Sequence, residues 1–404
     1  MAKPTVPAST QFEAGAPAAA GGIALCVPEL RGNERAYLLE CLDTNFVSSV
    51  GPFVNRFERE FARYVGATHA IATVNGTAAL HVALLTAGVE PDDEVLVSTL
   101  TFIAPVNAIR YANAWPVLID ADPAFWQMDP DRVVWFLETQ CRWASGELRN
   151  LTTGRRVRAI MPVHILGHPV DVDPIVAVAR KFGLAVIEDA TESLGARYRG
   201  RAVGLLGDIA CFSFNGNKLI TTGAGGMIVT ENEAWAARAK YLTTQAKDDA
   251  LEFVHGAVGY NYRLTNIQAA LGVAQLELVD EFIAVKRRIA ATYANAFRDM
   301  AGVTPMPAAP WAQSVFWLYT ILIDDAAVGK GSRALLRALA AAGIQARPLW
   351  QPAHRSPAHQ HAVMTPCPVA ESLNARAVSL PSSVGLTESE QARVVAAVTA
   401  AVSQ

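Results

Sequence analysis

Short apolar runs alternate with segments of helical periodicity along the chain from residue 27 to about residue 250. The apolar runs have the length of buried strands. The segments between them space their apolar residues three or four positions apart, as amphipathic helices do. Strands that alternate with helices predict an α/β domain with a largely parallel sheet. The predicted strands are 70–74, 94–97, 116–119, 158–163, 184–187, 209–214 and 227–230.

Helices are predicted in the intervening segments and after the last of these strands. Ligands of largely parallel sheets bind at the carboxyl ends of the strands. We therefore expect the functional residues in the loops that follow the strands. The predicted helices are 77–87, 104–111, one that begins at Pro130, 174–182, and 233 to about 242.

The pattern changes after Arg263, which predicts a smaller C-terminal α+β domain at 264–404. The large α/β domain is placed at 23–263. Residues 1–22, rich in alanine, proline, glycine and serine, are expected to form a flexible tail. The elements predicted after Arg263 are a long helix at 266–297, a strand at 315–323, a helix at 332–342, a short strand at 345–349 and a final helix from Glu388.

Composition narrows the possible partners. The chain has 404 residues, of which 51% are hydrophobic and 18% charged, and its net charge is -3. No lysine- or arginine-rich run is present, so nucleic acid is not an expected partner. The five cysteines are scattered, without a Cys-x-x-Cys pair, which favours a reducing cytoplasm. Neither a signal peptide nor a membrane span is expected, because the longest uncharged stretch, 302–323, contains three prolines.

One lysine stands at a strand end where chemistry is possible. Residues 213–218 read Ser-Phe-Asn-Gly-Asn-Lys, and they follow an apolar strand and precede a turn of small residues. Burial at such a place pushes a lysine toward its neutral amine, the form that Schiff-base chemistry requires. Taken alone, Lys218 is more simply an ordinary lysine in a loop between two strands.

A helix start follows the first strand of the α/β region. Asn75-Gly76-Thr77 would present free N–H groups to an anion, and Gly76 would allow a close approach. A simple helix N-cap explains this segment equally well. The sequence is neither Gly-x-x-x-x-Gly-Lys-Ser/Thr nor Gly-x-Gly-x-x-Gly, which disfavours a nucleoside triphosphate or NAD site.

Two further strand ends carry candidate chemistry. Asp189 and Glu192 follow an apolar strand, where a carboxylate could hold a protonated heterocyclic nitrogen or could serve as a surface acid or N-cap. Phe102 follows another strand and could stack on a planar ring, although core packing is the commoner role.

The remaining polar motifs are weaker. His164 and His168 are not expected to bind metal, because Gly167 and Pro169 break the helix that would put both rings on one face. The segment 259–264 mixes polar, aromatic and cationic residues, which suits a phosphate contact, an oligomer interface or ordinary packing at the junction of the two domains.

Together these motifs resemble one family, the fold-type I pyridoxal-phosphate aminotransferases that act on nucleotide sugars, known as the DegT/DnrJ/StrS group. The resemblance covers residues 27–398. It implies a large domain built on a mostly parallel seven-stranded sheet and a smaller C-terminal α+β domain. The matching motifs are Asn-Gly-Thr-Ala-Ala-Leu at 75–80, Thr-Phe at 101–102, Glu-Asp-Ala at 188–190, Phe-Ser-Phe-x-x-x-Lys at 212–218 and Gly-Tyr-Asn-Tyr-Arg at 259–263.

The resemblance also implies roles for individual residues. Lys218 would bind pyridoxal 5′-phosphate covalently and then move the proton, with pyridoxamine 5′-phosphate as an intermediate. The cofactor contacts that it implies are Gly76, Thr77 and Ser213 on the phosphate, Phe102 on the ring face, Asp189 on the ring nitrogen and Glu192 near the ring hydroxyl, where many relatives have glutamine or histidine.

Asn261 would reach the phosphate from a neighbouring subunit, which implies a homodimer with its active sites at the interface. Substrate contacts are expected from the loops that line the sugar site. The residues concerned are Ser48, His164, Lys247, Tyr260, Arg263, Trp350 and His354.

Within the group, the chain is most similar to 4-aminotransferases of 4-keto-6-deoxy-hexose nucleotides, on routes to legionaminic acid, bacillosamine and perosamine. We therefore expect amino transfer from L-glutamate to C4 of a UDP-linked, 2-acetamido sugar in surface polysaccharide biosynthesis. A 3-aminotransferase and a non-catalytic pyridoxal-phosphate-binding regulator remain alternatives. A 3-dehydratase of the same fold is disfavoured, because a histidine replaces the lysine there and Lys218 is present here.

Overall fold

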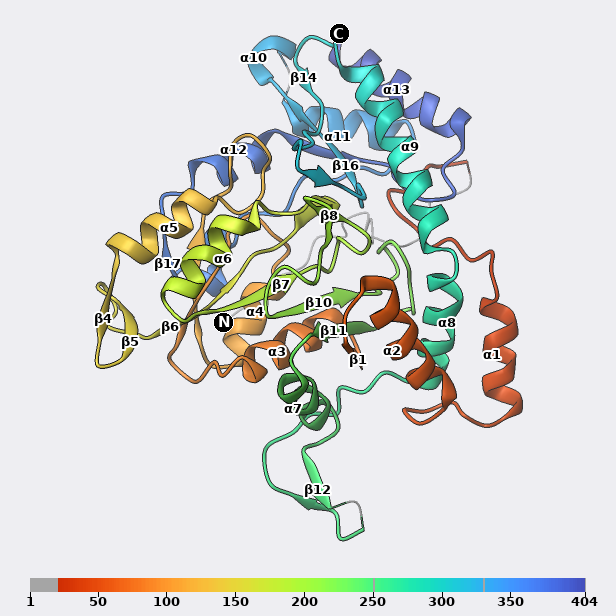
Figure 1. Ribbon diagram of the computed structural model, residues 1–404. Coiled ribbons are helices and arrows are strands. Elements are labelled where there is room, and N and C mark those ends of the chain that lie inside the picture. Colours follow the sequence, from red (N-terminus) through yellow and green to blue (C-terminus); the bar gives the residue numbers. More distant parts are fainter. Residues whose placement is uncertain (1–20, 250, 330, 404) are drawn as a thin grey trace, which may run out of the picture.

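The computed structural model describes residues 21–249, 251–329 and 331–403, and a mixed α/β core forms its centre (Figure 1). The main sheet has eight strands in the order β1-β11-β10-β7-β6-β2-β3-β17. All neighbouring strands are parallel except the pairs that β11 makes with β1 and β10. The strands are β1 (His69–Thr73), β2 (Glu94–Ser98), β3 (Trp115–Ile119), β6 (Val157–Met161), β7 (Ala185–Asp189), β10 (Ile209–Ser213), β11 (Gly226–Thr230) and β17 (Val363–Met364).

The prediction of a mostly parallel sheet is confirmed. The seven strands of the main sheet between residues 69 and 230 are the seven that the apolar runs predict, and each begins and ends within two residues of its predicted bounds. The eighth strand, β17, was not predicted, because two residues are too few to give a periodic signal.

Helices cover both faces of the sheet, since successive side chains of a strand point to opposite faces. Ile209 and Cys211 of β10 pack into the cluster on the face of α3, whereas Ala210 and Phe212 pack against α2 and α8. The helices of the first face are α3 (Gly76–Thr86), α4 (Ala104–Tyr111) and α7 (Glu233–Thr243). Those of the second are α2 (Pro52–Val65), α5 (Pro130–Thr139), α6 (Val172–Lys181) and α8 (Asn266–Leu276).

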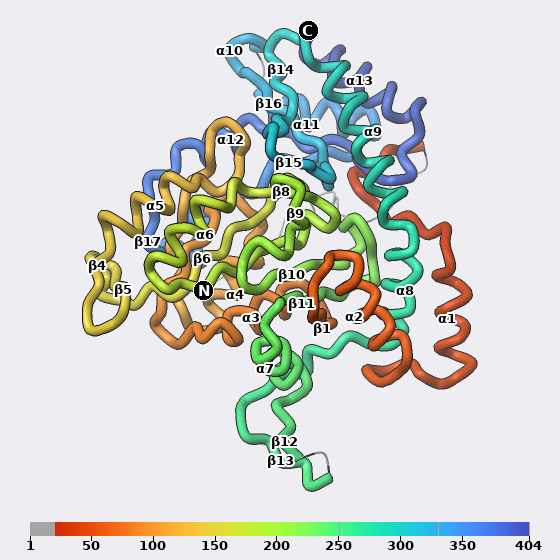
Figure 2. Tube along the Cα trace, viewed as in Figure 1, coloured from red at the N-terminus to blue at the C-terminus, as the bar shows by residue number. Residues whose placement is uncertain are grey.

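The chain after α8 gathers at one end of the molecule, apart from the segment that returns to the edge of the main sheet as β17 (Figure 2). A three-stranded sheet, β14-β16-β18, lies among its helices. The elements are α9 (Val279–Phe297), β14 (Val303–Thr304), β16 (Tyr319–Ile323), α10 (Asp325–Val328), α11 (Ser332–Ala341), α12 (Pro368–Arg376), β18 (Ala377–Leu380) and α13 (Glu388–Val402).

Short elements complete the fold. Helix α1 (Glu34–Asp43) packs against α8, and the hairpin β12–β13 projects away from the body (Figure 1). The remaining strands are β4 (Cys141–Ala144), β5 (Glu147–Asn150), β8 (Arg197–Tyr198), β9 (Arg201–Ala202), β12 (Lys247–Asp249), β13 (Val254–His255) and β15 (Ala312–Gln313).

Two predictions in the C-terminal region were wrong. The single helix predicted at 266–297 is two helices, α8 and α9, because Leu278 leaves the helical conformation, with φ -110° and ψ 2°. The preceding side chain, Glu277, is held by Asn33, Tyr37 and Arg56. The strand predicted at 345–349 is reduced to one bridge, in which Arg347 and Ser379 exchange backbone hydrogen bonds. Tertiary contacts decide both outcomes, and local periodicity does not report them.

The division of the chain at 263/264 stays a prediction, but the structure adds a contact across it. Ile23 exchanges backbone hydrogen bonds with Gly343 and Gln345, so the start of the described chain pairs with the C-terminal region. The predicted tail at 1–22 lies, except for residues 21 and 22, outside the described residues. All five cysteines are buried as free thiols. Across the described ranges, no helix combines the length and the apolarity that crossing a bilayer would need.

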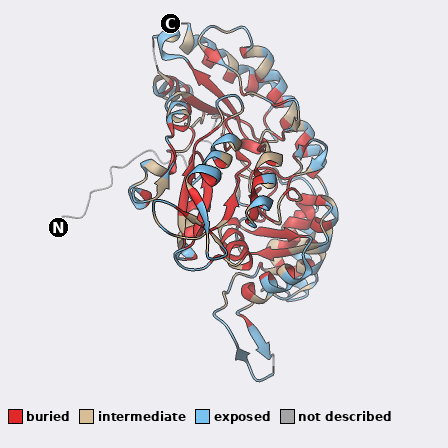
Figure 3. Cartoon of the chain, turned by 60° about the vertical axis from the view of Figure 1, so that its left-hand side comes forward, coloured by how far each residue is buried: buried red, intermediate tan, exposed pale blue. Residues whose placement is uncertain are grey.

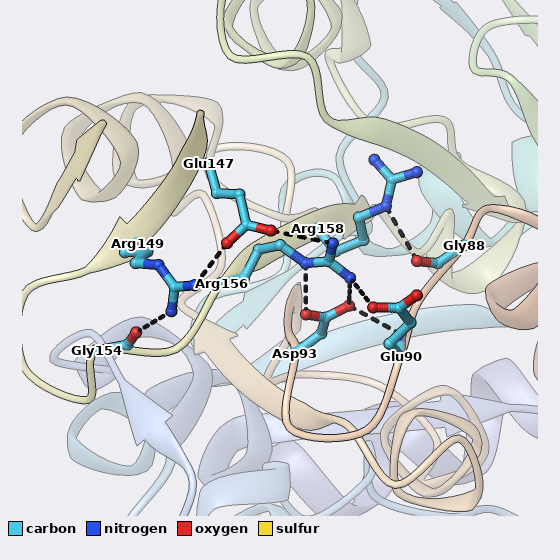
Figure 4. Close-up of polar contacts among 8 residues, drawn as sticks. All are labelled: Gly88, Glu90, Asp93, Glu147, Arg149, Gly154, Arg156 and Arg158. Carbon is cyan, nitrogen blue, oxygen red and sulfur yellow. Dashed lines mark hydrogen bonds and ion pairs between the residues drawn. The ribbon is translucent and has the colours of Figure 1, made fainter. Parts of the chain in front are cut away.

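An ion-pair network at the amino-terminal edge of the sheet centres on Arg156 (Figure 4). Its guanidinium donates two hydrogen bonds to Asp93, at 2.7 and 2.6 Å, and also contacts Glu90 at 2.9 Å and Glu147 at 3.4 Å. The Asp93 side chain is only 6% exposed, so Arg156 compensates a carboxylate that has lost most of its water.

The substitution Arg156→Met is expected to destabilise the protein by about 2–3 kcal/mol, since it leaves the Asp93 carboxylate buried without its partner. Arg149→Met is the matched control: Arg149 pairs with Glu147 at the surface and is 41% exposed, so its loss should cost about 0–1 kcal/mol. Urea unfolding midpoints of the two variants measure the difference, and equal midpoints would show that Arg156 is only a surface pair.

Candidate active site

A cavity of about 360 Å³ opens at the carboxyl ends of the central strands. Its lining comes from the start of α3, the loops after β2, β7 and β10, and the C-terminal region. The lining residues include Asn75, Gly76, Thr77, Thr101, Phe102, Asp189, Thr191, Glu192, Ser213, Asn215, Asn217, Lys218, Trp317, Arg347 and Trp350. The cavity therefore brings together all the predicted cofactor residues except Asn261, and one predicted substrate residue, Trp350.

Lys218 reaches this cavity from a tight turn after β10. Its backbone N–H donates to the carbonyl of Asn215 at 2.9 Å, and the Thr222 N–H donates back to the carbonyl of Phe214. The Nζ atom lies 3.3 Å from Oε1 of Glu192 and 4.2 Å from the centre of the Trp317 ring. The amine is thus held between a carboxylate and an aromatic face, with 14% of its side chain exposed.

The start of α3 also lines the cavity, and its groups suit an anion. Asn75 caps α3 by accepting a hydrogen bond from the Ala78 N–H, and the first-turn amides of Gly76 and Thr77 have no partner within the helix. A Cβ added to Gly76 would lie 2.8 Å from Cβ of Ser213, so only glycine allows α3 and β10 to approach this closely. Helix N–H groups beside the Ser213 hydroxyl are the kind of donors that suit a phosphate group.

Two acids lie at the end of β7 beside the lysine. Asp189 is 2% exposed and Glu192 is 6% exposed. Burial raises the pKa of both carboxyl groups, against the opposing attraction of the Lys218 ammonium. One oxygen of Asp189 accepts the Thr191 N–H, and one oxygen of Glu192 accepts the Leu166 N–H. A cation placed next to Asp189 would compensate the buried charge.

The residues present fit pyridoxal phosphate. The anion site at α3, the buried Asp189 and the amine of Lys218 supply the three kinds of contact that its phosphate, protonated ring nitrogen and aldehyde need. Phe102 is 55% exposed at the rim, which leaves its ring available for stacking.

His164 lies outside the cavity lining, in the core. The Val170 N–H donates to Nδ1 at 3.0 Å, so the proton is on Nε2, which donates to Glu188 at 3.1 Å. The ring is fully buried and both nitrogens are engaged within the protein. This geometry argues against the substrate contact expected for His164.

His354 is engaged in the same way. Its Nδ1 lies 2.8 Å from the Thr99 hydroxyl and its Nε2 lies 3.0 Å from Glu371. The side chain is 6% exposed. Both contacts hold the loop that follows Trp350, which favours a structural role over the predicted substrate contact.

Most of the other predicted substrate residues, and the predicted phosphate contact Asn261, lie away from the Lys218 cavity. Lys247, Asn261 and Arg263 line a second depression that shares no residue with it. Arg263 donates to the carbonyl of Ser49, next to Ser48, so this loop belongs to the same surface. Tyr260 stacks on Tyr262 and lies outside both linings.

The site residues predicted from the sequence did not include Trp317 or Arg347, which both line the cavity. Trp317 lies in the segment predicted as an ordinary buried strand. No strand-end pattern marks either one, because both reach the cavity from the C-terminal region. Within residues 21–249, 251–329 and 331–403, no cluster of potential metal ligands is found.

Comparison with known proteins gives the family. Residues 28–399 match the DegT/DnrJ/EryC1/StrS aminotransferase family. GDP-perosamine synthase of Caulobacter vibrioides is 43% identical over 376 residues, which cover 93% of this chain and 97% of that protein. The putative pyridoxal phosphate-dependent aminotransferase EpsN of Bacillus subtilis is 38% identical, over 92% of this chain and 94% of that protein.

Solved structures of sugar aminotransferases have a similar fold. The structure of DesV from S. venezuelae, solved in complex with a ketimine intermediate, matches with a TM-score of 0.82 at 30% identity and covers 92% of this chain and 95% of that chain. The cavity, the family match and these relatives agree on pyridoxal-phosphate chemistry directed at sugars. The chain therefore belongs to the DegT/DnrJ/EryC1/StrS family and is a pyridoxal-phosphate-dependent nucleotide-sugar aminotransferase.

Proposed function

We propose that the protein transfers an amino group from L-glutamate to C4 of a 4-keto-6-deoxyhexose linked to GDP, in the synthesis of a surface polysaccharide. The convergence of Lys218, Asp189 and the α3 anion site in one cavity supports transamination. The relatives named GDP-perosamine synthase support the GDP-linked sugar. They weigh against the UDP-linked, 2-acetamido sugar expected from the sequence, which becomes the second substrate to test.

In this proposal the cavity residues hold the cofactor, which would supply an electron sink when bound. Gly76, Thr77 and Ser213 would hold its phosphate, and Asp189 would keep its ring nitrogen protonated. The Lys218 amine would hold the cofactor covalently, and it would also act as the base that accepts the proton from Cα of the donor and as the proton carrier in the half-reaction with the sugar.

The donor requires a site for carboxylate, and Arg347 is placed to provide it. Its guanidinium lies 5.3 Å from the centre of the Trp317 ring, on whose face Lys218 also rests. Among the described residues, no hydrogen bond or ion pair engages this guanidinium. Burial lowers the pKa of Arg347, against the opposing attraction of Glu192. An arginine binds carboxylate through two parallel hydrogen bonds, so we propose that Arg347 takes a carboxylate of glutamate.

The substitution Arg347→Met should raise KM for glutamate about 10- to 100-fold, since a hydrogen-bonded charged contact contributes about 1.5–3 kcal/mol. The second half-reaction, from ketosugar and pyridoxamine-loaded protein, provides the control, because no donor carboxylate takes part in it. Rapid-mixing absorbance separates the two half-reactions. Equal losses in both would assign Arg347 to the cofactor or to the sugar.

We also propose that the protein is a homodimer, in which Asn261 and the second depression complete the partner's cavity. The hairpin β12–β13 projects into solvent, and the burial view shows it almost wholly exposed (Figure 3). Leu251 is 84% exposed and nearby Val258 is 80% exposed. Apolar side chains this exposed on an isolated protrusion are typical of an interface.

Mixed dimers test this arrangement. Lys218→Ala and Asn261→Asp protomers should each be inactive alone. A mixture in equal amounts should recover about a quarter of wild-type activity, because half of the dimers then contain one intact site. No recovery after dissociation and reassociation would place Asn261 in the same site as Lys218 of its own chain.

A substrate panel tests the proposed reaction itself. Glutamate-loaded protein is mixed with 4-keto and 3-keto sugars linked to GDP, UDP and dTDP, and the return of the visible absorbance of the aldehyde form of the cofactor is recorded. A response to GDP-linked 4-keto sugar supports the proposal. A response limited to 3-keto sugars identifies a 3-aminotransferase, and a cofactor band that glutamate does not bleach identifies a regulator.

A further inference from the structure

Lys286 on α9 is a lysine buried without a carboxylate. It is 1% exposed. Its ammonium donates to the backbone carbonyls of Trp317, at 2.9 Å, and Ser382, and it lies 3.5 Å from Sγ of Cys26. These contacts engage all three of its donors. Across the described part of the chain, no ion pair includes Lys286, so backbone and sulfur dipoles alone compensate its charge.

Two of these partners hold the same peptide group next to the active-site lysine. The indole Nε1 of Trp317 donates to the carbonyl of Asn217 at 2.5 Å. Sγ of Cys26 donates to the same carbonyl at 3.2 Å. The carbonyl that directly precedes Lys218 therefore receives two donors, and both belong to residues in contact with Lys286.

The contacts of Trp317 and Cys26 also surround the backbone and the amine of Lys218. The peptide between Asn217 and Lys218 is fixed at its carbonyl by these donors, and at its N–H by the carbonyl of Asn215. The ring of Trp317 also contacts the Lys218 amine. The backbone of Trp317 donates to Leu166, whose N–H in turn donates to Glu192.

We propose that Lys286 is a positioning residue for Lys218: its buried ammonium fixes Trp317 and Cys26, which hold the peptide that aims the Lys218 amine into the cavity. A methionine could fill the same space without the free energy that desolvating a charge requires. The ammonium group, unlike methionine, can hold three separate segments of the chain together through Cys26, Trp317 and Ser382. The inference rests on the proposed role of Lys218 as the cofactor lysine.

Lys286→Met tests this role in the full-length protein freed of cofactor. Covalent capture of pyridoxal phosphate by Lys218 is timed by visible absorbance and fixed by borohydride. Binding of 4′-deoxypyridoxine phosphate, which lacks the aldehyde, reports the phosphate and ring contacts alone. We expect capture and kcat to fall about 10- to 100-fold, as for a misplaced reacting group, while affinity for the deoxy analogue stays within about twofold because its contacts are unchanged.

Tyr293→Phe is the matched control. Tyr293 lies on the same helix, is fully buried, and donates to the carbonyl of Pro381 at 2.9 Å, but among the described residues no hydrogen bond joins it to Asn217 or Lys218. Loss of the Tyr293 hydroxyl group should lower the thermal stability of the protein and leave the rate of pyridoxal-phosphate capture unchanged. If Lys286→Met does not fold, Cys26→Ala and Trp317→Phe, which each remove one donor to Asn217, should slow capture instead.

The outcomes separate the two hypotheses. Wild-type protein that captures no pyridoxal phosphate would contradict the role of Lys218 itself. Wild-type capture with an unchanged rate in Lys286→Met, or in both donor variants where that protein does not fold, would overturn the positioning role. An equal loss of capture and of analogue binding would overturn it as well, since it would mark general damage to the site.

Discussion

Replacing Lys218 with alanine should abolish transamination and lower kcat about 10⁴-fold or more, because proton transfer by a positioned side chain alone contributes about 10²–10⁴-fold. Among the residues that the structure describes, Lys218 is the only lysine that lines the cavity, and its amine would both hold the cofactor and move the proton. No other described residue of the lining could take over its covalent role: Glu192 lies beside the amine, but a carboxyl group cannot form a Schiff base with the cofactor.

The same variant should still bind the cofactor. The α3 anion site, Ser213 and Asp189 are separate from the lysine side chain, so equilibrium dialysis should recover bound pyridoxal phosphate that borohydride does not fix. Lys218→Arg is the matched variant, because it keeps a cation in the cavity but offers no neutral amine. Retained turnover in either variant would refute the assignment of Lys218.

Local sequence patterns predicted the half of the site that the main sheet supplies. Asp189 and Ser213 end β7 and β10, and Gly76 begins the helix after β1. In each case an apolar strand is followed at once by a polar or small residue, and a parallel sheet brings such ends to one edge. Periodicity therefore indicated that these residues stand at strand ends and a helix start, while their roles toward a cofactor came from the family resemblance and stay predictions.

The other half of the cavity arises from packing between distant segments. Trp317 looked like any strand residue, yet hydrogen bonds to Lys286 and Asn217 fix it beside Lys218. His164 is the opposite case: a histidine after a strand was predicted as a substrate contact, but Glu188, the neighbour of Asp189 in sequence, points to the other face of the sheet and binds the His164 ring. One position along a strand changes the face, and polarity alone does not reveal which face is the site.

Asp189→Asn should lower kcat about 10²–10³-fold, the loss expected when one charged group that stabilises the transition state is removed. In the cofactor-free protein, burial raises the pKa of Asp189. A protonated ring nitrogen would stabilise the carboxylate, and the carboxylate would keep that nitrogen protonated. Asparagine has the same shape and can still accept the Thr191 N–H through its side-chain oxygen, so the fold should persist while the nitrogen loses its proton.

Glu192→Gln is the control for Asp189→Asn. It shows whether kcat falls because the charge beside the ring nitrogen is lost, or because any buried carboxylate of the cavity is lost. Glu192 lies 3.3 Å from the Lys218 Nζ atom, but the resemblance places it near the ring hydroxyl, and the Leu166 contact can persist with glutamine. Its kcat should therefore fall much less than that of Asp189→Asn, and the cofactor band should shift in Asp189→Asn alone. If Glu192→Gln instead shows the larger loss, then the ring nitrogen faces Glu192, and the cofactor lies in the cavity turned relative to the orientation proposed here.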